Sequence, residues 1–411
     1  MDIREVMGAI LTLSMFLMLG NMIKKDHFDG DVLYDVPATT VASDIDVLQA
    51  TRHKLTQLSD VSTNYGQQSK LCFNASLLPK VTGPSKRFVT FSLTDGPEYH
   101  VSQVANAVLV SEQLGATLVL PDIIGSKGGK KGFEEIYDVQ KFISSMGSVV
   151  QVETRKHYNM FTRKLKSVKV PYNAKRDYIM ANVEPLFRGT QNVRVITYFP
   201  TTIMGEGRVD KDTNPYSCWV AFEALRLKPE LQEVVKSVVG WLKSQEMDNR
   251  LIAIDYKSEM LGTSSCGNHA NKGMKSCYNI DEIAQFLQRI GYPRYSAIYV
   301  TQSKPDRSLS SFKDLYPKTF TKEDIMREAE MGVFAKSELE QEIIDFHLCS
   351  VSDVFVPAKS GLFYAKVAGN RIASGRMGVL VPAQKTSNIA KEYVSSYISK
   401  RNHPAYGCFC E

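Results

Sequence analysis

The stretch LIAIDYKSEM, residues 251–260, decides how the fold is interpreted. It opens with four apolar residues, and so short an apolar run is typical of a strand buried on both faces of a parallel sheet. Three charged residues then follow without a turn residue between them: Asp255, Lys257 and Glu259. In parallel α/β sheets ligands bind beyond the carboxyl ends of the strands, so this charge is predicted to face a binding cleft.

The chain after this strand keeps an alternating pattern. Asn279 and Glu282 have the spacing of a capping box that begins a helix, and residues 297–301 form the next predicted strand. The further predicted elements are a helix near residues 309–315, a helix at 340–349, a strand at 353–356 and a helix at 360–368. Strands that alternate with helices indicate β-α-β units and a parallel sheet.

A similar series lies earlier in the chain. Residues 88–93 and 116–120 are predicted strands, and residues 100–114 carry apolar side chains at helical spacing. A charged helical region, residues 225–248, separates the two series. The predicted fold class is therefore α/β, with two facing Rossmann-like domains and a cleft between them. The predicted boundaries are residues 86–245 for the first domain, 246–395 for the second domain and 396–411 for a tail.

Length and composition agree with a folded protein of this kind. The chain has 411 residues, 43% hydrophobic and 23% charged, which is enough for two domains. The net charge of +6 is spread along the chain. It suits an anionic small ligand better than a nucleic-acid partner, which would need a dense basic stripe.

The N-terminus departs from this composition. Residues 6–23 contain no charge, and at about 1.5 Å per residue they are just long enough to cross a thin bilayer. A cleaved signal peptide is the alternative, but no small-x-small cleavage site follows. The prediction is a cytosolic tail at residues 1–5, a retained transmembrane signal anchor at 6–23 and a stem at 24–85. By the positive-inside rule, Lys24 and Lys25 favour a cytosolic location for the residues that follow the span. Other features must therefore place the rest of the chain in the lumen.

Glycosylation and cysteine signals point to the lumen. Asn74 begins an Asn-Ala-Ser glycosylation sequon. Cys266 and Cys277 bracket a short polar loop whose length suits a disulfide, and the loop has neither a CxxC pair nor a pair of His partners for a metal. Near the C-terminus Cys408 and Cys410 have three open partners, Cys72, Cys218 and Cys349, and one of the seven cysteines must stay odd.

Two strand-end regions supply candidate chemistry. Lys257 is predicted to neutralise a departing diphosphate, and the alternative is an ordinary ion pair with Asp255 or Glu259. In the earlier series Asp95 and Glu98 lie in a strand-to-helix loop, where a carboxylate is able to take a proton from an acceptor hydroxyl. Helix capping is the alternative for both. The neighbouring acceptor-side candidates are Gly96 and His100.

A third region lies in the segment SDVFVPAKSG, residues 352–361. Ser352 and Asp353 are predicted to bind a sugar or a base through its hydrogen-bond donors, and the amides of Ser360 and Gly361 a phosphate, because a helix begins there. The alternative is that Asp353 merely caps a turn.

Metal and hydrolase motifs are not found in the sequence. The Asp-x-Asp pairs lie in the stem or in a polar loop, and neither HExxH nor GxSxG occurs. No metal or other cofactor is expected.

In several long segments the chain resembles the plant O-fucosyltransferase-like superfamily, and within it the proteins related to mannan synthesis. The resemblance rests on LTLSMFLMLGNMIKKDHFD (11–29), GPEYHVSQVANAV (96–108), LGATLVLPDI (114–123), YFPTT (198–202), LIAIDYKSEM (251–260), KSCYNIDEIAQFL (275–287), YPKTFTKEDI (316–325) and SDVFVPAKSGLFYA (352–365). It implies a type II Golgi membrane protein whose lumenal body is a metal-independent, inverting glycosyltransferase of GT-B-like fold with a GDP-sugar donor. It also implies that residues 86–245 form the acceptor-side domain and residues 246–395 the donor-binding domain. The family has an arginine at the position of Lys257, and Asp353 matches a donor-side aspartate.

Three functions remain open at this point. The first is a Golgi glycosyltransferase that acts on a mannan or glucomannan polysaccharide acceptor. The second is a protein O-fucosyltransferase. The third is a non-catalytic accessory factor in a mannan synthase complex, because lysine keeps the charge of arginine but not its two-pronged donor geometry.

Overall fold

The computed structural model describes most of the chain after Lys70. The described residues are 70–74, 77–78, 85, 87–94, 96–125, 128–154, 165–172, 174–199, 214–246, 249–261, 277–302, 307–328, 337–383 and 387–410. The predicted anchor at residues 6–23, Asp95 and Cys266 lie outside them. No helix within the described residues is both long enough and apolar enough to span a membrane.

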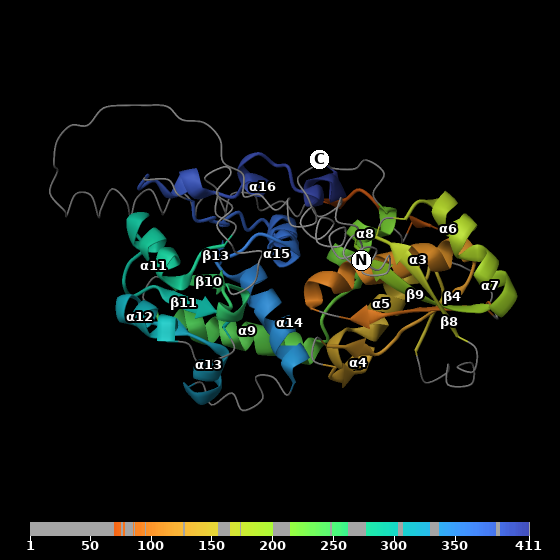
Figure 1. Cartoon of the computed structure of the whole chain (residues 1–411), viewed down its shortest axis with the longest axis horizontal. Coiled ribbons are helices and arrows are strands. Elements are labelled where there is room, and N and C mark those ends of the chain that lie inside the picture. The colour runs from red at the N-terminus through yellow and green to blue at the C-terminus, as the bar shows by residue number, and fades with distance from the viewer. Residues whose placement is uncertain are drawn as a thin grey trace, which may run out of the picture.

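The first half of the protein is built on a five-stranded parallel sheet in the order β7-β4-β2-β9-β8 (Figure 1). Its strands are β2 (Phe88–Phe91), β4 (Thr117–Val119), β7 (Val152–Glu153), β8 (Lys166–Pro171) and β9 (Asn192–Tyr198). Its helices are α3 (Pro97–Leu114), α4 (Phe133–Ile136), α5 (Val139–Met146), α6 (Arg176–Asn182), α7 (Glu184–Thr190) and α8 (Pro215–Trp219), which the π-helix η5 (Val220–Ala224) continues. A small sheet of β3 (Leu93–Thr94), β5 (Ile123–Ile124) and β6 (Lys130–Lys131) lies beside it.

The second half is built on a four-stranded parallel sheet in the order β12-β11-β10-β13. Its strands are β10 (Leu251–Asp255), β11 (Ala297–Val300), β12 (Thr319–Phe320) and β13 (Val354–Pro357). Its helices are α10 (Ser258–Leu261), α11 (Ile280–Arg289), α12 (Arg307–Leu315), α13 (Lys322–Glu328), α14 (Glu338–Val351) and α15 (Leu362–Ala373). All five residues of β10 are buried, which confirms the buried strand predicted from LIAID.

Local sequence signals explain where these helices begin. Asn279 accepts a hydrogen bond from the amide of Glu282, whose side chain accepts one from the amide of Asn279 in return. Ser337 and Glu340 form the same reciprocal pair at the start of α14. Each of these capping boxes gives a hydrogen-bond partner to two backbone amides near the helix N-terminus, which have no partner within the helix. The starts of both helices are therefore fixed by local sequence.

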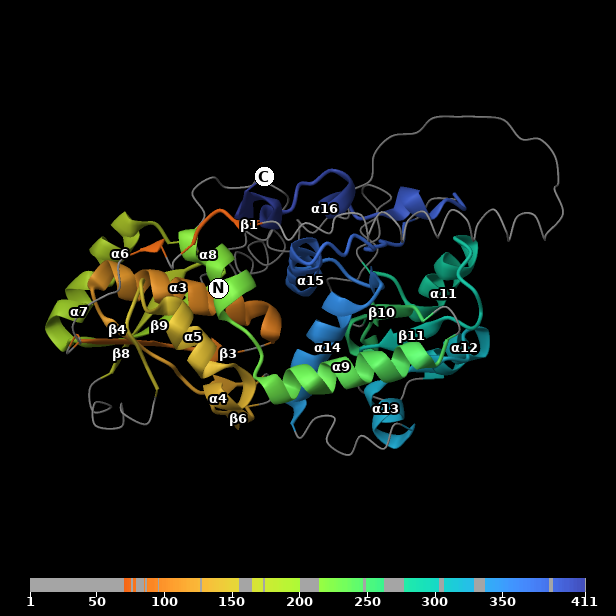
Figure 2. The same cartoon turned by 180° about the vertical axis from the view of Figure 1, so that it is seen from behind.

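Helix α9 (Pro229–Ser244) joins the two halves and packs against the second sheet. It contacts β10, β11 and α14, and Figure 2 shows it lying along these elements. Lys243 near its end forms an ion pair of 2.8 Å with Asp353. The predicted domain boundary at residue 245 therefore falls after a helix whose contacts belong to the second half.

Helix α3 lies between the two halves. Its buried residues Val104, Ala105 and Val108 are all 0% exposed, and besides the first sheet it contacts α14 and α15 of the second half. One hydrophobic cluster accordingly contains residues of both halves. Because α3 is held from both sides, its N-terminus is fixed at the boundary of the two halves.

The tail, residues 395–410, returns from the second half to the first. It contains α16 (Ser396–Ser399), the 3-10 helix η8 (Pro404–Cys408) and β14 (Phe409–Cys410), which pairs antiparallel with β1 (Lys70–Leu71). The short 3-10 helix η7 (Ala390–Tyr393) precedes it. On the second half the His403 ring makes a hydrogen bond of 2.9 Å to the carbonyl of Ala365 in α15. The tail is thus attached to both halves.

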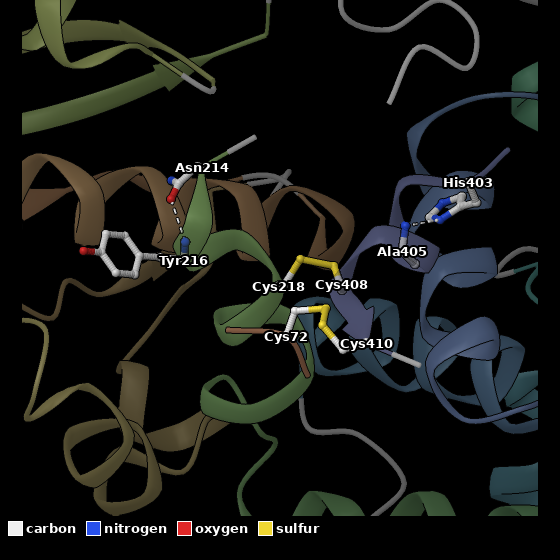
Figure 3. Close-up of a disulfide and its surroundings, with 8 residues drawn as sticks. All are labelled: Cys72, Asn214, Tyr216, Cys218, His403, Ala405, Cys408 and Cys410. Carbon is white, nitrogen blue, oxygen red and sulfur yellow. Dashed lines mark hydrogen bonds between the residues drawn. A yellow bond between two sulfur atoms is a disulfide. The ribbon is translucent and has the colours of Figure 1, made fainter. Parts of the chain in front are cut away.

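Two disulfides fasten the tail to the first half (Figure 3). They join Cys72 to Cys410 and Cys218 to Cys408. These are two of the partners that the sequence left open, and Cys349 is the free, buried cysteine. Cys277 is also disulfide-bonded, whereas its predicted partner Cys266 lies outside the described residues.

Loss of one tail disulfide is expected to destabilise the protein. Replacing Cys218 and Cys408 together by serine removes a link between residues 190 positions apart, and we expect the free energy of unfolding to fall by about 2–4 kcal/mol. Denaturant titration without reductant measures the difference. Cys349→Ser is the control, because this thiol forms no disulfide within the described chain. Equal stability of the double variant and this control would contradict the prediction.

Candidate active site

The carboxyl end of β10 carries a buried carboxylate. Asp255 is the last residue of the strand and is 6% exposed. The hydroxyl Oγ1 of Thr301, which follows β11, donates to Oδ1 of Asp255 over 3.3 Å. Burial raises the pKa of Asp255 to about 6, although the charge of Lys257 opposes this rise. Asp255 is therefore mostly ionised at neutral pH and turns neutral under mildly acidic conditions.

Lys257 follows two residues later and is half-buried. Burial lowers its pKa, but the carboxylates of Asp345, Asp255, Glu342 and Glu98 outweigh burial, so its pKa is raised overall. Within the described part of the protein its ammonium group takes part in no hydrogen bond or ion pair. A half-buried cation without such a partner is suited to binding an anionic ligand.

Glu98 approaches from the first half. It lies in the first turn of α3, next to Pro97, and its carboxylate accepts a hydrogen bond from its own amide. Burial raises its pKa from the ordinary 4.5 to about 7, and the charges of Asp255 and Glu342 add to the rise, while Lys257 opposes it. A carboxylate that titrates near neutrality is suited to general acid-base chemistry.

The start of α3 leaves room for this carboxylate. Gly96 caps the helix in an extended conformation, and a Cβ at this position would collide with Oε2 of Glu98. Gly96 thus leaves room for the Glu98 carboxylate, and its acceptor-side role stays a prediction. Its companion His100 is 0% exposed, and its Nδ1 lies 2.6 Å from the hydroxyl of Tyr137. Direct contact of His100 with an acceptor is therefore contradicted, because the ring faces the core.

The start of α15 lies at the same edge of the second sheet as Asp255. Asp255 pairs with Pro357, the last residue of β13, and α15 begins at Leu362 after Ser360 and Gly361. Gly361 caps the helix with a φ of 141°, a conformation that glycine adopts without strain, and as a glycine it offers no side-chain oxygen to the amides of the first turn. Open amides at a helix N-terminus and the positive end of the helix dipole favour an anion such as phosphate.

Two comparisons with known proteins identify the family. A family model described as GDP-fucose protein O-fucosyltransferase matches residues 100–373. Protein MANNAN SYNTHESIS-RELATED 1 of Arabidopsis thaliana is 41% identical over 100% of this chain and 99% of its own length. The chain belongs to the O-fucosyltransferase family. A second member, Protein MANNAN SYNTHESIS-RELATED of Trigonella foenum-graecum, is also 41% identical, over 100% of this chain and 99% of its own.

Among solved structures, that of POFUT1 in complex with GDP is similar to this chain, with a TM-score of 0.47 and 13% identity. The superposition covers 73% of this chain and 99% of that chain.

The prediction for Ser352 and Asp353 is wrong. Asp353 precedes β13 and therefore lies at the amino end of the parallel sheet, about 13 Å from the carboxyl end where Asp255 lies. Its carboxylate accepts from the amide of Leu251 and pairs with Lys243. Ser352 is 0% exposed and accepts from Nη1 of Arg371. Ser352 and Asp353 thus stabilise the starts of β13 and β10. This is a structural role, like the turn capping that was the alternative for Asp353.

Several residues of the site carry no local sequence signal. Glu342 and Asp345 lie within α14, and Thr301 and Gln302 follow β11. Gln302 accepts from the amide of Ser258 over 2.7 Å and so orients α10, where Glu259, which was predicted to face the binding cleft, is exposed. The position of Thr301 and Gln302 at the carboxyl end of a predicted strand was the one signal that could have revealed these two residues. Among the residues that the structure describes, no group of His, Cys, Asp and Glu could hold a metal ion.

Proposed function

We propose that this member of the O-fucosyltransferase family is an inverting, metal-independent glycosyltransferase of GT-B-like fold that transfers a sugar from a GDP-sugar to a mannan or glucomannan chain. The observation that carries the proposal is the half-buried Lys257, whose ammonium group has no hydrogen-bonding partner among the described residues and which follows β10 at the sheet edge where α15 also begins. The names of the full-length relatives support the polysaccharide. The remaining parts of the proposal are a lumenal body, a type II Golgi membrane anchor and association with a mannan synthase complex.

The proposed reaction is a single displacement. Glu98, ionised, takes the proton of an acceptor hydroxyl while the oxygen forms a bond to the anomeric carbon of the donor. The bond from this carbon to the diphosphate breaks, and its electron pair leaves with GDP. Lys257 and the open amides at Ser360 and Gly361 stabilise the charge that develops on the diphosphate. Attack from the face opposite the leaving group inverts the anomeric carbon.

Lys257→Ala is expected to weaken GDP binding by about tenfold or more, because a charge-assisted contact to phosphate is lost. Titration of GDP into the purified full chain, followed by melting temperature or calorimetry, measures the change. Lys257→Arg is expected to bind at least as well as the wild type, since arginine offers two donors. Guanosine, which has no diphosphate, serves as the matched ligand and should bind both proteins equally.

The same titrations separate the three candidate functions. Stabilisation of the wild type by GDP and its sugars, but not by UDP, supports the transferase. If no nucleotide stabilises the wild type, the proposal fails and the accessory role remains. Transfer to a folded peptide domain but not to a mannan oligosaccharide would instead identify a protein O-fucosyltransferase.

A further inference from the structure

Three aromatic rings form a row at the carboxyl edge of the first sheet. Tyr99 lies in the first turn of α3, Phe199 follows β9 and Tyr172 follows β8. The ring centroids of Tyr99 and Phe199 are 5.3 Å apart, and those of Phe199 and Tyr172 are 5.6 Å apart. We call these three residues the aromatic row.

The aromatic row begins at the proposed catalytic base and ends at the second half. Tyr99 is the residue after Glu98. At the other end Nζ of Lys366, on α15, lies 5.6 Å from the centroid of the Tyr172 ring. The row therefore follows the boundary of the two halves, where a substrate that reaches Glu98 must also pass.

Packing alone gives a poor account of these rings. The core rings of the first half, such as Phe91, Phe133 and Phe142, are at most 1% exposed. All three rings of the aromatic row are only half-buried, including that of Phe199, which has no polar atom to keep in water. The hydroxyl of Tyr172 donates to nothing within the described residues. Each ring thus keeps surface that a ligand would cover.

We infer that the aromatic row binds the acceptor, and that the acceptor is an extended polysaccharide rather than a folded protein. The inference rests on the proposed transferase function. A pyranose ring presents a face of C–H groups that packs on an aromatic ring, while its hydroxyls bond to groups such as the Tyr172 hydroxyl and the Lys366 ammonium. Successive rings in a row match successive sugar units. A serine or threonine in a folded domain comes with backbone amides, which rings do not satisfy.

The test is the binding of mannobiose and mannohexaose by the full chain, measured by calorimetry. The wild type should bind the longer oligosaccharide more tightly. Tyr172→Ala and Phe199→Ala should each weaken mannohexaose binding by about tenfold, and the gain with length should shrink. Tyr172→Phe keeps the ring and should retain most of the affinity. The control is Tyr295→Ala, since Tyr295 is a 66% exposed ring of the second half.

GDP binding to the same variants separates this inference from the proposed function. Neither Tyr172 nor Phe199 belongs to the proposed donor site, so GDP affinity should stay within about twofold of the wild type. GDP binding together with equal mannohexaose affinity of all variants would overturn the inference alone. Absence of mannohexaose binding by the wild type would overturn it as well. Absence of GDP binding by the wild type would overturn the proposed function.

Discussion

Replacing Glu98 by glutamine is expected to lower kcat by about 10²–10⁴-fold. Glutamine has almost the same shape but cannot accept the proton of the acceptor hydroxyl. The pKa of about 7 makes Glu98 ionised in a large fraction of molecules at neutral pH and still basic enough to take a proton. Initial rates with saturating GDP-sugar and acceptor measure the loss. GDP affinity should be retained, because Glu98 lies on the acceptor side.

The pH dependence gives a second reading of the same residue. In the wild type kcat/KM should rise with pH through about 7, as Glu98 becomes ionised, and this limb should be absent in Glu98→Gln. Stability should follow the opposite course. The folded state binds the Glu98 proton more tightly than the unfolded state, because the pKa is raised from 4.5 to about 7. As the pH rises through this range, the free energy of unfolding of the wild type should therefore fall relative to that of Glu98→Gln.

Gly96→Ala tests whether the position of this carboxylate matters. The added methyl group would occupy the place of Oε2 of Glu98 and should turn the carboxylate away, with kcat reduced and the fold retained. A Glu98→Gln enzyme with wild-type kcat and an unchanged pH profile would rule out Glu98 as the base.

Replacing Arg371 by alanine is expected to destabilise the protein by about 3–5 kcal/mol. Arg371 is 0% exposed, and its guanidinium donates to the carbonyls of Cys349 and Ser352 through Nη1 and of Asp353 and Gly378 through Nη2. It thereby joins the end of α14 to the start of β13. Without it, buried carbonyls lose their donors, each at a cost of about 1–3 kcal/mol. Urea denaturation measures the change.

Arginine geometry, rather than charge alone, is the reason for this effect. Arg371→Lys should recover only part of the stability, because one ammonium group cannot donate in both directions. Arg376→Ala is the control, since this half-buried arginine of the same region makes no side-chain hydrogen bond or ion pair with described residues, and a change within about 0.5 kcal/mol is expected. Arg371→Lys with wild-type stability would contradict the account.

Much of the fold follows from local patterns. The apolar run at residues 251–254 and the Asn279 capping box both correspond to the observed β10 and α11. The direction of β10 was enough to place Asp255 and Lys257 at the edge that binds ligands in parallel sheets. The strand-to-helix junction that carries Glu98 was also predicted, because such a junction is a local feature of the sequence.

Other parts of the site depend on contacts between distant segments. Glu342 and Asp345 are charged residues within a helix, and only the packing of α14 brings them near Lys257. The burial that moves the pKa of Glu98 arises where the two halves meet. The error on Asp353 has a different origin. A residue that precedes a parallel strand lies at its amino end, so strand direction alone already argued against a place in the same site as Asp255.

The tail disulfides also make the chain from Cys72 to Cys410 a covalent ring. The Cys72–Cys410 bond closes a circle that includes both sheets, and the Cys218–Cys408 bond divides this circle into two loops. One proteolytic cut anywhere between residues 72 and 410 opens the circle but does not release either fragment. On gel electrophoresis, protein that has been cut once in this range should therefore migrate as a single species until its disulfides are reduced.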